Sequence, residues 1–271
     1  MFDIAITIVN YKMTEDIREL LACLKEDLAG SDLKAQIVVV DNTPEEGAWL
    51  MLKNNFPEVK YLPQSGNIGF GRAQNIGLRA VEARYYFILN PDVIFPAGER
   101  VLPRLFEYME ANPKIGLVGP KLLNNDGTLQ FSCYRFPSFW IPLYRRSSWG
   151  QKKKNKKKVD NYLMKNFEHN RAKPVDWLMG SAMFARGQAL QQVGLFDERY
   201  FMYFEDCDWC RRFWEAHWPV YYVHDIKIRH RHGKGSANVP GFFRSMSRNP
   251  LTRVHITSWL KYMWKWRFKN V

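Results

Sequence analysis

Apolar residues in the first half of the chain form short continuous runs that alternate with segments of helical spacing. The runs are rich in Val, Ile, Phe and Tyr and have the length of buried strands, at residues 2–10, 36–41, 59–62, 85–89 and 115–119. Between them, apolar positions three and four residues apart predict helices at residues 14–29, 69–83 and 96–111. We expect Thr14 to cap the first helix and Gly30 to end it. This alternation predicts an α/β fold around a doubly wound, mostly parallel sheet.

The second half of the chain is less regular. Asn124-Asn-Asp-Gly127 is a hairpin-turn signal, and a loop-rich insertion is expected after it, with a mobile lysine-rich loop at residues 145–170. Regular structure is predicted again from residue 175, where an apolar run to residue 184 indicates a strand. The later elements are expected to be helices at residues 188–193 and 205–214 and strands at residues 220–223 and 226–230.

Polar side chains stand at the ends of three predicted strands. Asn10, Asp41 and Asp92 each end or follow a buried run. Ordinary turn formation explains any one of them, because Asn and Asp are common in turns. In a parallel sheet, however, the carboxyl ends of the strands meet at one edge, and ligands bind there. Three such residues in one sheet therefore favour a binding site.

The charge of the chain narrows the class of partner. The formal net charge is +13, and the excess lies in two places. Residues 152–158 hold six lysines, and residues 227–271 hold eleven Lys or Arg without an Asp or Glu. This asymmetry implies an anionic partner, which composition leaves open between nucleic acid, lipid head groups and a phosphorylated substrate. A solvated charge run is the alternative for the lysine cluster.

Cysteine usage and hydropathy bear on the compartment. The four cysteines are too few and too irregularly spaced for a disulfide framework, which fits a reducing, cytoplasmic setting. Cys207 and Cys210 have CxxC spacing, but no second pair completes a zinc site. No signal peptide is expected, and no apolar run reaches the roughly 20 residues of a spanning helix. We therefore expect a soluble or peripheral protein.

A glycine-rich turn precedes one predicted helix. Gly66-Asn-Ile-Gly-Phe-Gly71 leads into that helix, and free backbone N–H groups at such a place suit a phosphate or a nucleotide. The spacing differs from the dinucleotide-binding fingerprint, and the turn follows the third strand instead of the first. A plain turn is the alternative.

Two acidic sites carry the candidate chemistry. Asp92 ends a hydrophobic strand, where one carboxylate can bind a Mg²⁺ or Mn²⁺ ion that also contacts a diphosphate. His230 or His232 can add a nitrogen ligand, and we prefer His230. Glu205 and Asp206 open a predicted helix behind an aromatic run, which raises a carboxylate pKa and suits a general base. Stabilisation of the helix dipole is the alternative for this pair.

Six ordered motifs resemble those of family 2 GT-A glycosyltransferases, especially the bacterial rhamnosyltransferase-like branch. They fall within residues 3–235. The motifs are Val9-Asn-Tyr11, Val40-Asp-Asn42, Asn67-Ile-Gly-Phe-Gly-Arg-Ala-Gln-Asn75, Leu89-Asn-Pro-Asp92, Trp177-Leu-Met-Gly180 and residues 196–212. Six motifs in the family's order are a far more specific signal than any one of them alone.

The resemblance implies a GT-A fold and an inverting transfer from a nucleotide sugar. In it, Asn10 and Asp41 would hold the base and ribose. Asn67, Gly69, Phe70 and Asn75 would wall the nucleotide. Asn90 and Arg212 would also contact the nucleotide sugar. Asn90 stands in place of the first acid of the family's metal site. Arg212 is equally a candidate partner of Asp208.

The resemblance also assigns the reacting groups. Trp177 and Gly180 would border the donor sugar. Asp92 and His230 would bind Mg²⁺ or Mn²⁺, and Asp206, with Glu205 beside it, would deprotonate the acceptor hydroxyl. The expected donor is dTDP-rhamnose, and the expected acceptor is a glycan or an undecaprenyl-type lipid-linked sugar of bacterial surface polysaccharide. A UDP-hexose-dependent transferase and a nucleotidyl or phosphoryl transferase are the alternatives.

The last residues interleave aromatic rings with cations. Trp259, Trp264, Trp266 and Phe268 alternate with Lys and Arg, which on a helix makes an interfacial element. We therefore expect residues 241–271 to attach peripherally to an anionic membrane, the inner face of the plasma membrane. A helix packed on the domain or a dimer contact is the alternative.

The expected domain division follows from the resemblance. Residues 1–240 form the glycosyltransferase domain, in which residues 1–120 bind the nucleotide and residues 121–240 bind the acceptor. Two other classes compete with the enzyme. A nucleic-acid binder explains the charge but leaves Asp92, Asp206 and the glycine loop unused, so we expect no nucleic-acid partner. A non-catalytic nucleotide-sugar-binding protein would not need Asp206 as a base.

Overall fold

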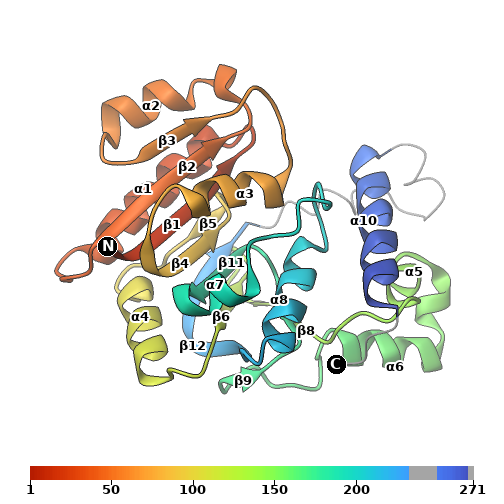
Figure 1. Cartoon of the computed structure of the whole chain (residues 1–271). Helices are drawn as coiled ribbons and strands as arrows, with labels where there is room; N and C mark the ends of the chain where they lie inside the picture. Colours follow the sequence, from red (N-terminus) through yellow and green to blue (C-terminus); the bar gives the residue numbers. More distant parts are fainter. Residues whose placement is uncertain (232–248, 268–271) are drawn as a thin grey trace.

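The computed structural model describes residues 1–231 and 249–267, and within them one large mixed sheet has helices on both faces (Figure 1). Its parallel part comprises β1 (Phe2–Asn10), β2 (Ala35–Asp41), β3 (Lys60–Pro63) and β4 (Ala83–Leu89). A second parallel pair is β6 (Leu117–Leu123) and β12 (Val220–His230), and β11 (Ala182–Arg186) runs antiparallel between the two groups. With the two-residue strand β5 (Val93–Ile94), the order is β3-β2-β1-β4-β11-β6-β12-β5. The predicted α/β class with a mostly parallel sheet is confirmed.

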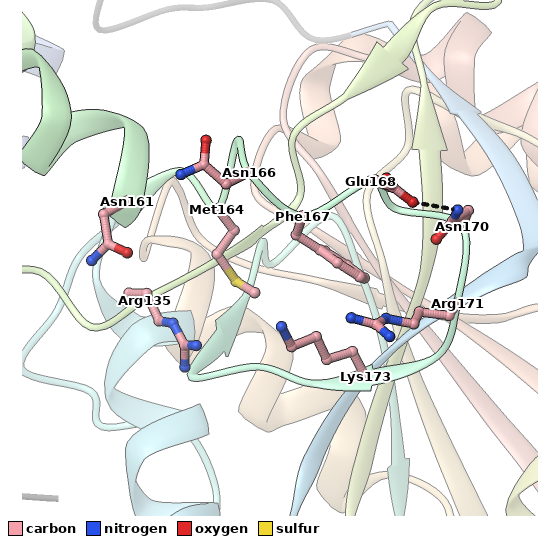
Figure 2. A pocket seen from close by; sticks show the side chains of 9 residues that line it. All are labelled: Arg135, Asn161, Met164, Asn166, Phe167, Glu168, Asn170, Arg171 and Lys173. Atoms are coloured by element: carbon pink, nitrogen blue, oxygen red, sulfur yellow. Dashed lines mark hydrogen bonds between the residues drawn. The ribbon is translucent and has the colours of Figure 1, made fainter.

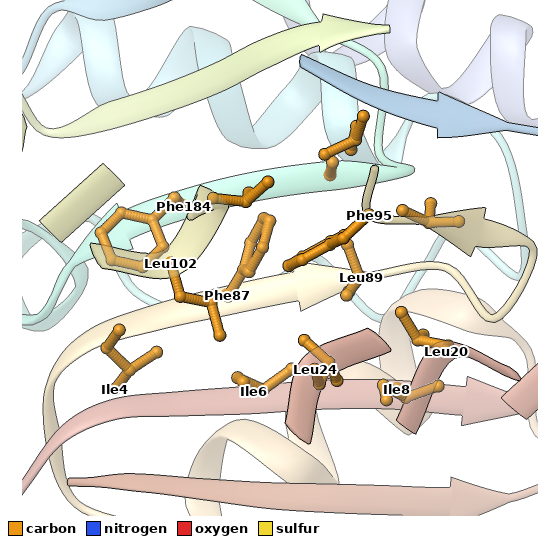
Figure 3. Close-up of a cluster of buried hydrophobic side chains, with 14 of the residues drawn as sticks. Ile4, Ile6, Ile8, Leu20, Leu24, Phe87, Leu89, Phe95, Leu102 and Phe184 are labelled. Carbon is orange, nitrogen blue, oxygen red and sulfur yellow. The ribbon is translucent and has the colours of Figure 1, made fainter. Parts of the chain in front are cut away.

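Each face of the sheet is covered by its own helices and its own core. Side chains alternate between the faces along a strand, so Ile4, Ile6 and Ile8 of β1 point to one side and Ala5 to the other. The helices of the first face are α1 (Thr14–Leu28), α2 (Ala48–Asn55) and α4 (Val101–Ala111), and their leucines meet those isoleucines and the rings of β4 (Figure 3). The helices of the second face are α3 (Phe70–Arg79), α7 (Gly187–Val193) and α8 (Glu205–Glu215). The sheet is therefore doubly wound, as predicted.

The short strand β5 curls the sheet. It begins three residues after β4 ends but pairs with the far end of β12, where Val93 lies opposite His230 and Ile94 opposite Arg229. The end of the last long strand is thereby brought beside residue 92. This pairing joins parts of the chain that lie far apart in sequence.

The insertion between the two halves contains more helix than expected. The Asn124–Gly127 turn closes a hairpin of β6 with β7 (Leu129–Gln130), as predicted. After β8 (Cys133–Tyr134) come α5 (Ile141–Arg146), the 3₁₀ turn η2 (Ser148–Gln151), α6 (Lys153–Tyr162) and β9 (Lys173–Pro174). The prediction of a loop at residues 145–170 is wrong in this respect, because lysine is a good helix former even where no apolar periodicity signals a helix.

Three other predicted boundaries are corrected. The apolar run at residues 175–184 is two strands, β10 (Trp177–Leu178) in a separate pair with β8 and β11 in the main sheet. Met13 is the N-cap of α1, so Thr14 is its first residue and not its cap. Helix α4 begins at Val101 instead of residue 96 or 97, because the carboxylate of Asp27 in α1 accepts from the amides of Val101 and Leu102 at 2.7 Å.

The tail forms helix α10 (Pro250–Trp266), which packs on the body of the domain. Trp259, Tyr262 and Trp266 are buried there, and the hydroxyl of Ser258 donates to the carbonyl of Met202 at 2.8 Å. Packing on the domain was the stated alternative to membrane attachment of the tail, and these buried aromatic residues follow that alternative. Among the described residues, every helix falls short of the length and apolarity that crossing a bilayer requires.

Candidate functional site

Asn10 and Asp41 lie side by side at the carboxyl ends of β1 and β2. They are paired in the β1–β2 register, both are fully buried, and Asn10 Nδ2 donates to Asp41 Oδ1 at 2.8 Å. Asp41 also accepts from the amide of Thr43 at 2.9 Å and from the hydroxyl of Tyr61 at 2.8 Å. Burial, followed by the Asp41 hydrogen bond and charge, raises the pKa of the Tyr61 phenol, so it stays a donor. Sequence and structure thus agree on a polar corner at this edge.

Asn42 and Asn67 extend this corner to the glycine-rich turn. Asn42 Nδ2 lies 3.3 Å from Asn67 Oδ1 and 3.4 Å from the carbonyl of Gly69, and Asn67 Oδ1 accepts from the Gly69 amide at 3.0 Å. The carbonyl oxygen of the buried Asn42 side chain has no hydrogen-bond partner among the described residues. An oxygen left in this state is suited to accept from a ligand donor such as a base or a ribose hydroxyl.

Gly69 is required by its backbone and by a close neighbour. Its φ is +89°, and an added Cβ would lie 2.4 Å from the carbonyl oxygen of Phe201. That same carbonyl accepts from the Phe70 amide at 2.8 Å, so the turn that opens α3 is fixed to the segment that precedes α8. The glycine-rich turn is therefore a docking point for the second half of the chain as well as a wall of the site.

We expect Gly69→Ala to destabilise the protein by about 2 kcal/mol or more, because strain at positive φ and the clash with Phe201 add. Gly66→Ala is the matched control, since its Cβ would meet open space. Thermal unfolding of both variants checks the prediction. Equal melting temperatures for the two would contradict the close approach at Gly69.

The structure brings Asp92 and His230 together. His230 Nε2 lies 3.3 Å from Asp92 Oδ1, and His230 is 3% exposed. Gln130 orients the imidazole: its amide nitrogen donates to Asn124 Oδ1 and to the carbonyl of His230, which leaves its oxygen to accept from His230 Nδ1 at 2.6 Å. The Gln130 oxygen thus places the Nδ1 proton and fixes the ring orientation, with Nε2 facing Asp92. His232, the other candidate, lies outside the described residues.

This pair fits a divalent cation that is shared with a substrate. Adjacent ligands of a six-coordinate Mg²⁺ lie roughly 3 Å apart, which matches the Asp92–His230 separation. Within residues 1–231 and 249–267, no cluster of three or more His, Cys, Asp or Glu side chains could hold a metal by itself. Mg²⁺ characteristically takes one or two protein ligands and completes its shell with water and phosphate oxygens.

Asp206 is held at the same edge by the backbone of Gly180. Asp206 Oδ2 accepts from the Gly180 amide at 2.9 Å, and Oδ1 accepts from the Cys207 amide at 2.7 Å. The next residue along, Ser181, accepts from the Asn90 amide at 2.9 Å, two residues before Asp92. The segment between β4 and β5, which carries Asp92, is thus linked through residues 180–181 to the helix that carries Asp206. The two predicted acidic sites share one edge.

Burial raises the pKa of both carboxyls at the start of α8. For Asp206, burial outweighs the hydrogen bonds from Gly180 and Cys207 and raises the pKa to about 6. For Glu205, burial, followed by the charge of Asp206, raises the pKa well above its usual value, and its Oε2 has no hydrogen-bond partner among the described residues. Glu205 packs against Gly71 at the start of α3. The pair therefore combines an acid that tends to stay neutral with one that ionises near pH 6.

We expect the rate of a reaction that uses Asp206 as a base to rise with pH through about 6 and then level off, because only the ionised carboxylate accepts a proton. Stability should move the other way. The folded state raises this pKa from 3.8 to about 6, so it binds the proton more tightly than the unfolded chain, and stability falls as the pH rises between these values. Initial rates and melting temperatures across this window check both signs. A rate that falls as the pH rises through 6 would contradict the assignment.

Three other predicted site residues make internal contacts. Asn75, fully buried, exchanges two hydrogen bonds of 2.9 Å with the backbone of Phe196 and so fixes the segment before α8. Arg212 donates to Asp208 and to the carbonyls of Val193, Gly194 and Leu195, which is the structural role that the sequence left open. The indole of Trp177 stacks on Tyr134 at 4.5 Å and donates to the carbonyl of Arg135.

A cavity of about 510 Å³ lies apart from this edge, on the insertion. Arg135, Lys173 and Arg171 line it with polar side chains from residues 161–170, and none of the predicted site residues does (Figure 2). Arg135 is paired with Asp176 at 2.9 Å, and the ammonium of Lys173 lies 5.0 Å from the centre of the Phe167 ring. The cavity is basic, but Arg135 and Lys173 already have partners within the protein.

Several residues of the site carry no sequence signal. Tyr61 and Gln130 act on Asp41 and His230 from elements with unremarkable sequence. Asn42 closes the Val40-Asp-Asn42 motif, but no role was predicted for its side chain. Only the packed structure shows what these side chains contact.

Comparison with known proteins gives the family. The sequence model described as "Glycosyl transferase family 2" matches residues 3–173. The chain is 28% identical over 251 residues to the N-acetylglucosaminyl-diphospho-decaprenol L-rhamnosyltransferase of Mycobacterium tuberculosis, covering 86% of this chain and 77% of that protein. It is 27% identical over 247 residues to the rhamnosyltransferase WbbL of Escherichia coli, covering 83% of each.

The archaeal low-salt glycan biosynthesis hexosyltransferase Agl10 of Haloferax volcanii is also similar, at 27% identity over 78% of this chain and 61% of that protein. The solved structure of Staphylococcus aureus TarS residues 1–349 in complex with UDP has a TM-score of 0.56 at 12% identity. It covers 84% of this chain, and this chain spans 60% of it. At that identity the likeness shows the GT-A fold alone. The fold, the six ordered motifs and the family match together show that this chain belongs to glycosyltransferase family 2 and resembles its rhamnosyltransferases.

Proposed function

We propose that this glycosyltransferase moves a sugar, rhamnose from dTDP-rhamnose as the first choice, onto a glycan or lipid-linked acceptor with inversion at the anomeric carbon. One observation carries the proposal: the backbone of residues 180–181 binds Asp206 on one side and Asn90, two residues before Asp92, on the other. A carboxylate suited to a base and a pair suited to a metal therefore lie at one sheet edge.

The donor nucleotide is assigned to the corner formed by the ends of β1 and β2. Asn10, Asp41 and Asn42 offer buried oxygens to base and ribose donors there, and Asn67 lies within reach of Asn42. Gly69 and Phe70 form the adjoining wall at the start of α3. Gly180 and Trp177 border the sugar on the opposite side. Asn75 and Arg212 serve this site indirectly, because they hold the segment before α8 and α8 itself in place.

Asp92 and His230 would hold Mg²⁺ or Mn²⁺. A divalent ion there neutralises charge that grows on the departing diphosphate. The chain's part is to keep Asp92 beside His230 through the β5–β12 pairing and to orient the imidazole through Gln130, so that Nε2 faces Asp92. Asn90 replaces an acid that would otherwise add a second negative charge.

Asp206 takes the proton of the acceptor hydroxyl. Its partial burial and pKa near 6 leave it ionised at neutral pH, yet more basic than an exposed carboxylate. The amides of Gly180 and Cys207 orient this carboxylate. The acceptor hydroxyl is itself the nucleophile in a single displacement, so no nucleophilic side chain is needed. Glu205, kept neutral by burial, can donate a hydrogen bond from its carboxyl group.

The acceptor class follows from the relatives. One acts, by its name, on N-acetylglucosaminyl-diphospho-decaprenol, which is a lipid-linked sugar. We propose an acceptor of this kind, undecaprenyl-type in this chain, and a peripheral position on the inner face of the plasma membrane. A UDP-hexose donor is the second candidate, favoured by the UDP complex of TarS and by the hexosyltransferase Agl10.

The proposal is tested by thermal unfolding with a panel of nucleotide sugars, with and without Mn²⁺, followed by product analysis. We expect dTDP-rhamnose with Mn²⁺ to raise the melting temperature most and dTDP to be released on transfer, with an inverted glycosidic linkage. A larger effect of UDP-hexoses would select the second candidate. Release of diphosphate itself would indicate a nucleotidyl transferase and would contradict the proposal.

Asp92→Asn is expected to lower the transfer rate with Mn²⁺ at least about tenfold and to weaken the Mn²⁺-dependent part of donor binding. The reason is that one of two protein ligands is lost. Asp32→Asn, an exposed substitution outside the edge, is the matched control. Isothermal titration of each variant with donor, in Mn²⁺ and in chelator, measures the difference. Equal Mn²⁺ dependence in the two variants would count against the metal site.

A further inference from the structure

Three large aromatic side chains of the insertion face solvent. Phe139 is 44% exposed, Trp140 49% and Trp149 58%. Trp140 and Trp149 flank an open cavity of about 360 Å³ together with Tyr144 and Lys152. Exposed rings gathered in this way mark a surface that binds something, because monomeric proteins rarely leave such groups unused.

Helix α10 continues this surface with its outer side. Its inner side buries Trp259, Tyr262 and Trp266, while Leu260 is 49% and Trp264 63% exposed, one helical turn apart. The ring of Phe139 packs on Trp259 at 4.8 Å, which joins the insertion to α10. Figure 1 shows α5, α6 and α10 on the same side of the molecule, far from α2 and β3.

The lysine cluster lies on the same insertion and has no acidic partners. All six lysines at residues 152–158 are exposed, and none forms an ion pair with a carboxylate in the described part of the chain. Lys153 and Lys154 open α6, whose first turn contains no acid. Cations at the positive end of a helix dipole destabilise the helix. An anionic surface that covers α6 would offset that cost.

We propose that Phe139, Trp140, Trp149, Leu260, Trp264 and the lysines of residues 152–158 form one docking surface for the head-group region of an anionic phospholipid bilayer. The inference rests on the proposed transfer to a lipid-linked acceptor and assigns the membrane contact to α5, η2, α6 and α10 jointly. Indole rings partition into the head-group layer, and lysines bind the negative surface potential. The buried aromatic residues of the tail do not take part.

The position of this surface relative to the base supports a bilayer. His255 of α10 packs on the rings of Tyr203 and Phe204 at 4.9 and 5.4 Å, directly before Glu205 and Asp206. A helix seated on a membrane through its outer side would hold the start of α8 close to that membrane. An acceptor anchored by a lipid is confined to that layer, so it meets the base without leaving the bilayer.

Sedimentation with vesicles of phosphatidylcholine, with and without phosphatidylglycerol, tests the proposal on the full chain. We expect binding to the vesicles that contain phosphatidylglycerol. The triple variant Lys153→Gln, Lys154→Gln, Lys157→Gln should weaken it roughly 100-fold, at about fivefold per lysine. Trp264→Ser should weaken it as well. Leu50→Ser, an exposed apolar substitution on α2, is the matched control and should bind normally.

The other outcomes are decisive in different ways. Full binding by the triple variant, or binding to neutral vesicles alone, overturns the proposal, as does tight salt-dependent binding of an oligonucleotide without vesicle binding. The change in melting temperature caused by nucleotide sugars, measured on the same variants without vesicles, tests donor binding independently of membrane binding. If the protein binds vesicles but no nucleotide sugar shifts its melting temperature, the docking surface is supported and the proposed sugar transfer is contradicted. If nucleotide sugars shift the melting temperature but the protein does not bind vesicles, the docking surface is contradicted and the transfer is supported.

Discussion

Asp206→Asn is expected to lower kcat by about 10² to 10⁴-fold, the usual contribution of a general base, with little change in donor affinity. Asparagine keeps the shape of the side chain and still accepts from the Gly180 amide, but it cannot take a proton. Initial-rate measurements with the donor that raises the melting temperature most separate kcat from KM. The variant should also lose the rise in rate through about pH 6 that is expected of the wild type.

Glu205→Gln is the informative comparison for this prediction. Its carboxyl is already neutral in the folded protein, so the amide should retain most of the rate and the same pH profile. If Asp206→Asn kept full activity while Glu205→Gln lost it, the base would have to be reassigned to Glu205. If both kept full activity, the chain would bind nucleotide sugars without catalysing this transfer at α8.

Lys265→Met is expected to destabilise the protein by about 3 kcal/mol, which corresponds to roughly 6 to 12 °C in Tm. Asp208 is fully buried in α8, and Lys265 Nζ contacts its Oδ1 at 2.6 Å, while the Trp266 indole donates to the same oxygen at 2.9 Å. Arg212 binds the other oxygen at 3.0 Å. Removal of the lysine leaves the buried carboxylate of Asp208 with only one of these two cationic partners, Arg212.

The same lysine also binds Asp197 at 2.9 Å. Burial would raise the pKa of Asp197, but hydrogen bonds from Arg199 and Lys265 hold it well below its usual value. Stability from this group is therefore present at neutral pH and is lost as the pH falls, more gradually in Lys265→Met. Lys261→Met, on the exposed side of α10, is the control and should change Tm little. A Tm for Lys265→Met equal to that of the control would show that α10 contributes little to the body.

The double variant Asp208→Asn, Lys265→Met separates the pair from simple loss of packing. Once the carboxylate is neutral, loss of the lysine leaves no buried charge short of a partner, so Lys265→Met should cost less in the Asp208→Asn background than in the wild type.

The sheet and the site edge could be predicted because their signals are local. β1, β2 and β4 are continuous apolar runs, and polar residues at their ends meet wherever parallel strands share an edge. Asn10, Asp41 and Asp92 are such residues. The proximity of His230 to Asp92 could not be derived from periodicity, because it depends on a two-residue strand that pairs across 136 residues of sequence, from Val93 to His230 and its neighbours. His230 was preferred as a ligand from its place at the end of the last predicted strand and from the family resemblance, but neither shows which pairing brings it to Asp92.

Apart from the helix in the lysine-rich segment, which depends on local propensity, the following errors come from capping and packing by distant residues. The start of α4 is set by Asp27, whose carboxylate caps it from another helix. The break at Gly180 inside an apolar run exists because its amide binds Asp206. The tail was expected to be an interfacial element, yet three of the four aromatic residues in α10, Trp259, Tyr262 and Trp266, are buried, and Lys265 contacts the buried carboxylate of Asp208 in α8. None of these partners lies within a sequence window that a local pattern covers.

The contact of Phe201 with the glycine-rich turn has a consequence for donor binding. The carbonyl of Phe201 accepts from the Phe70 amide, and Asn75 binds the backbone of Phe196, so two points of the segment before α8 are fastened to α3. That segment runs on into Asp206, so a ligand that shifted the start of α3 would also shift the proposed base. Occupation of the proposed nucleotide corner and alignment of the proposed base are then mechanically coupled.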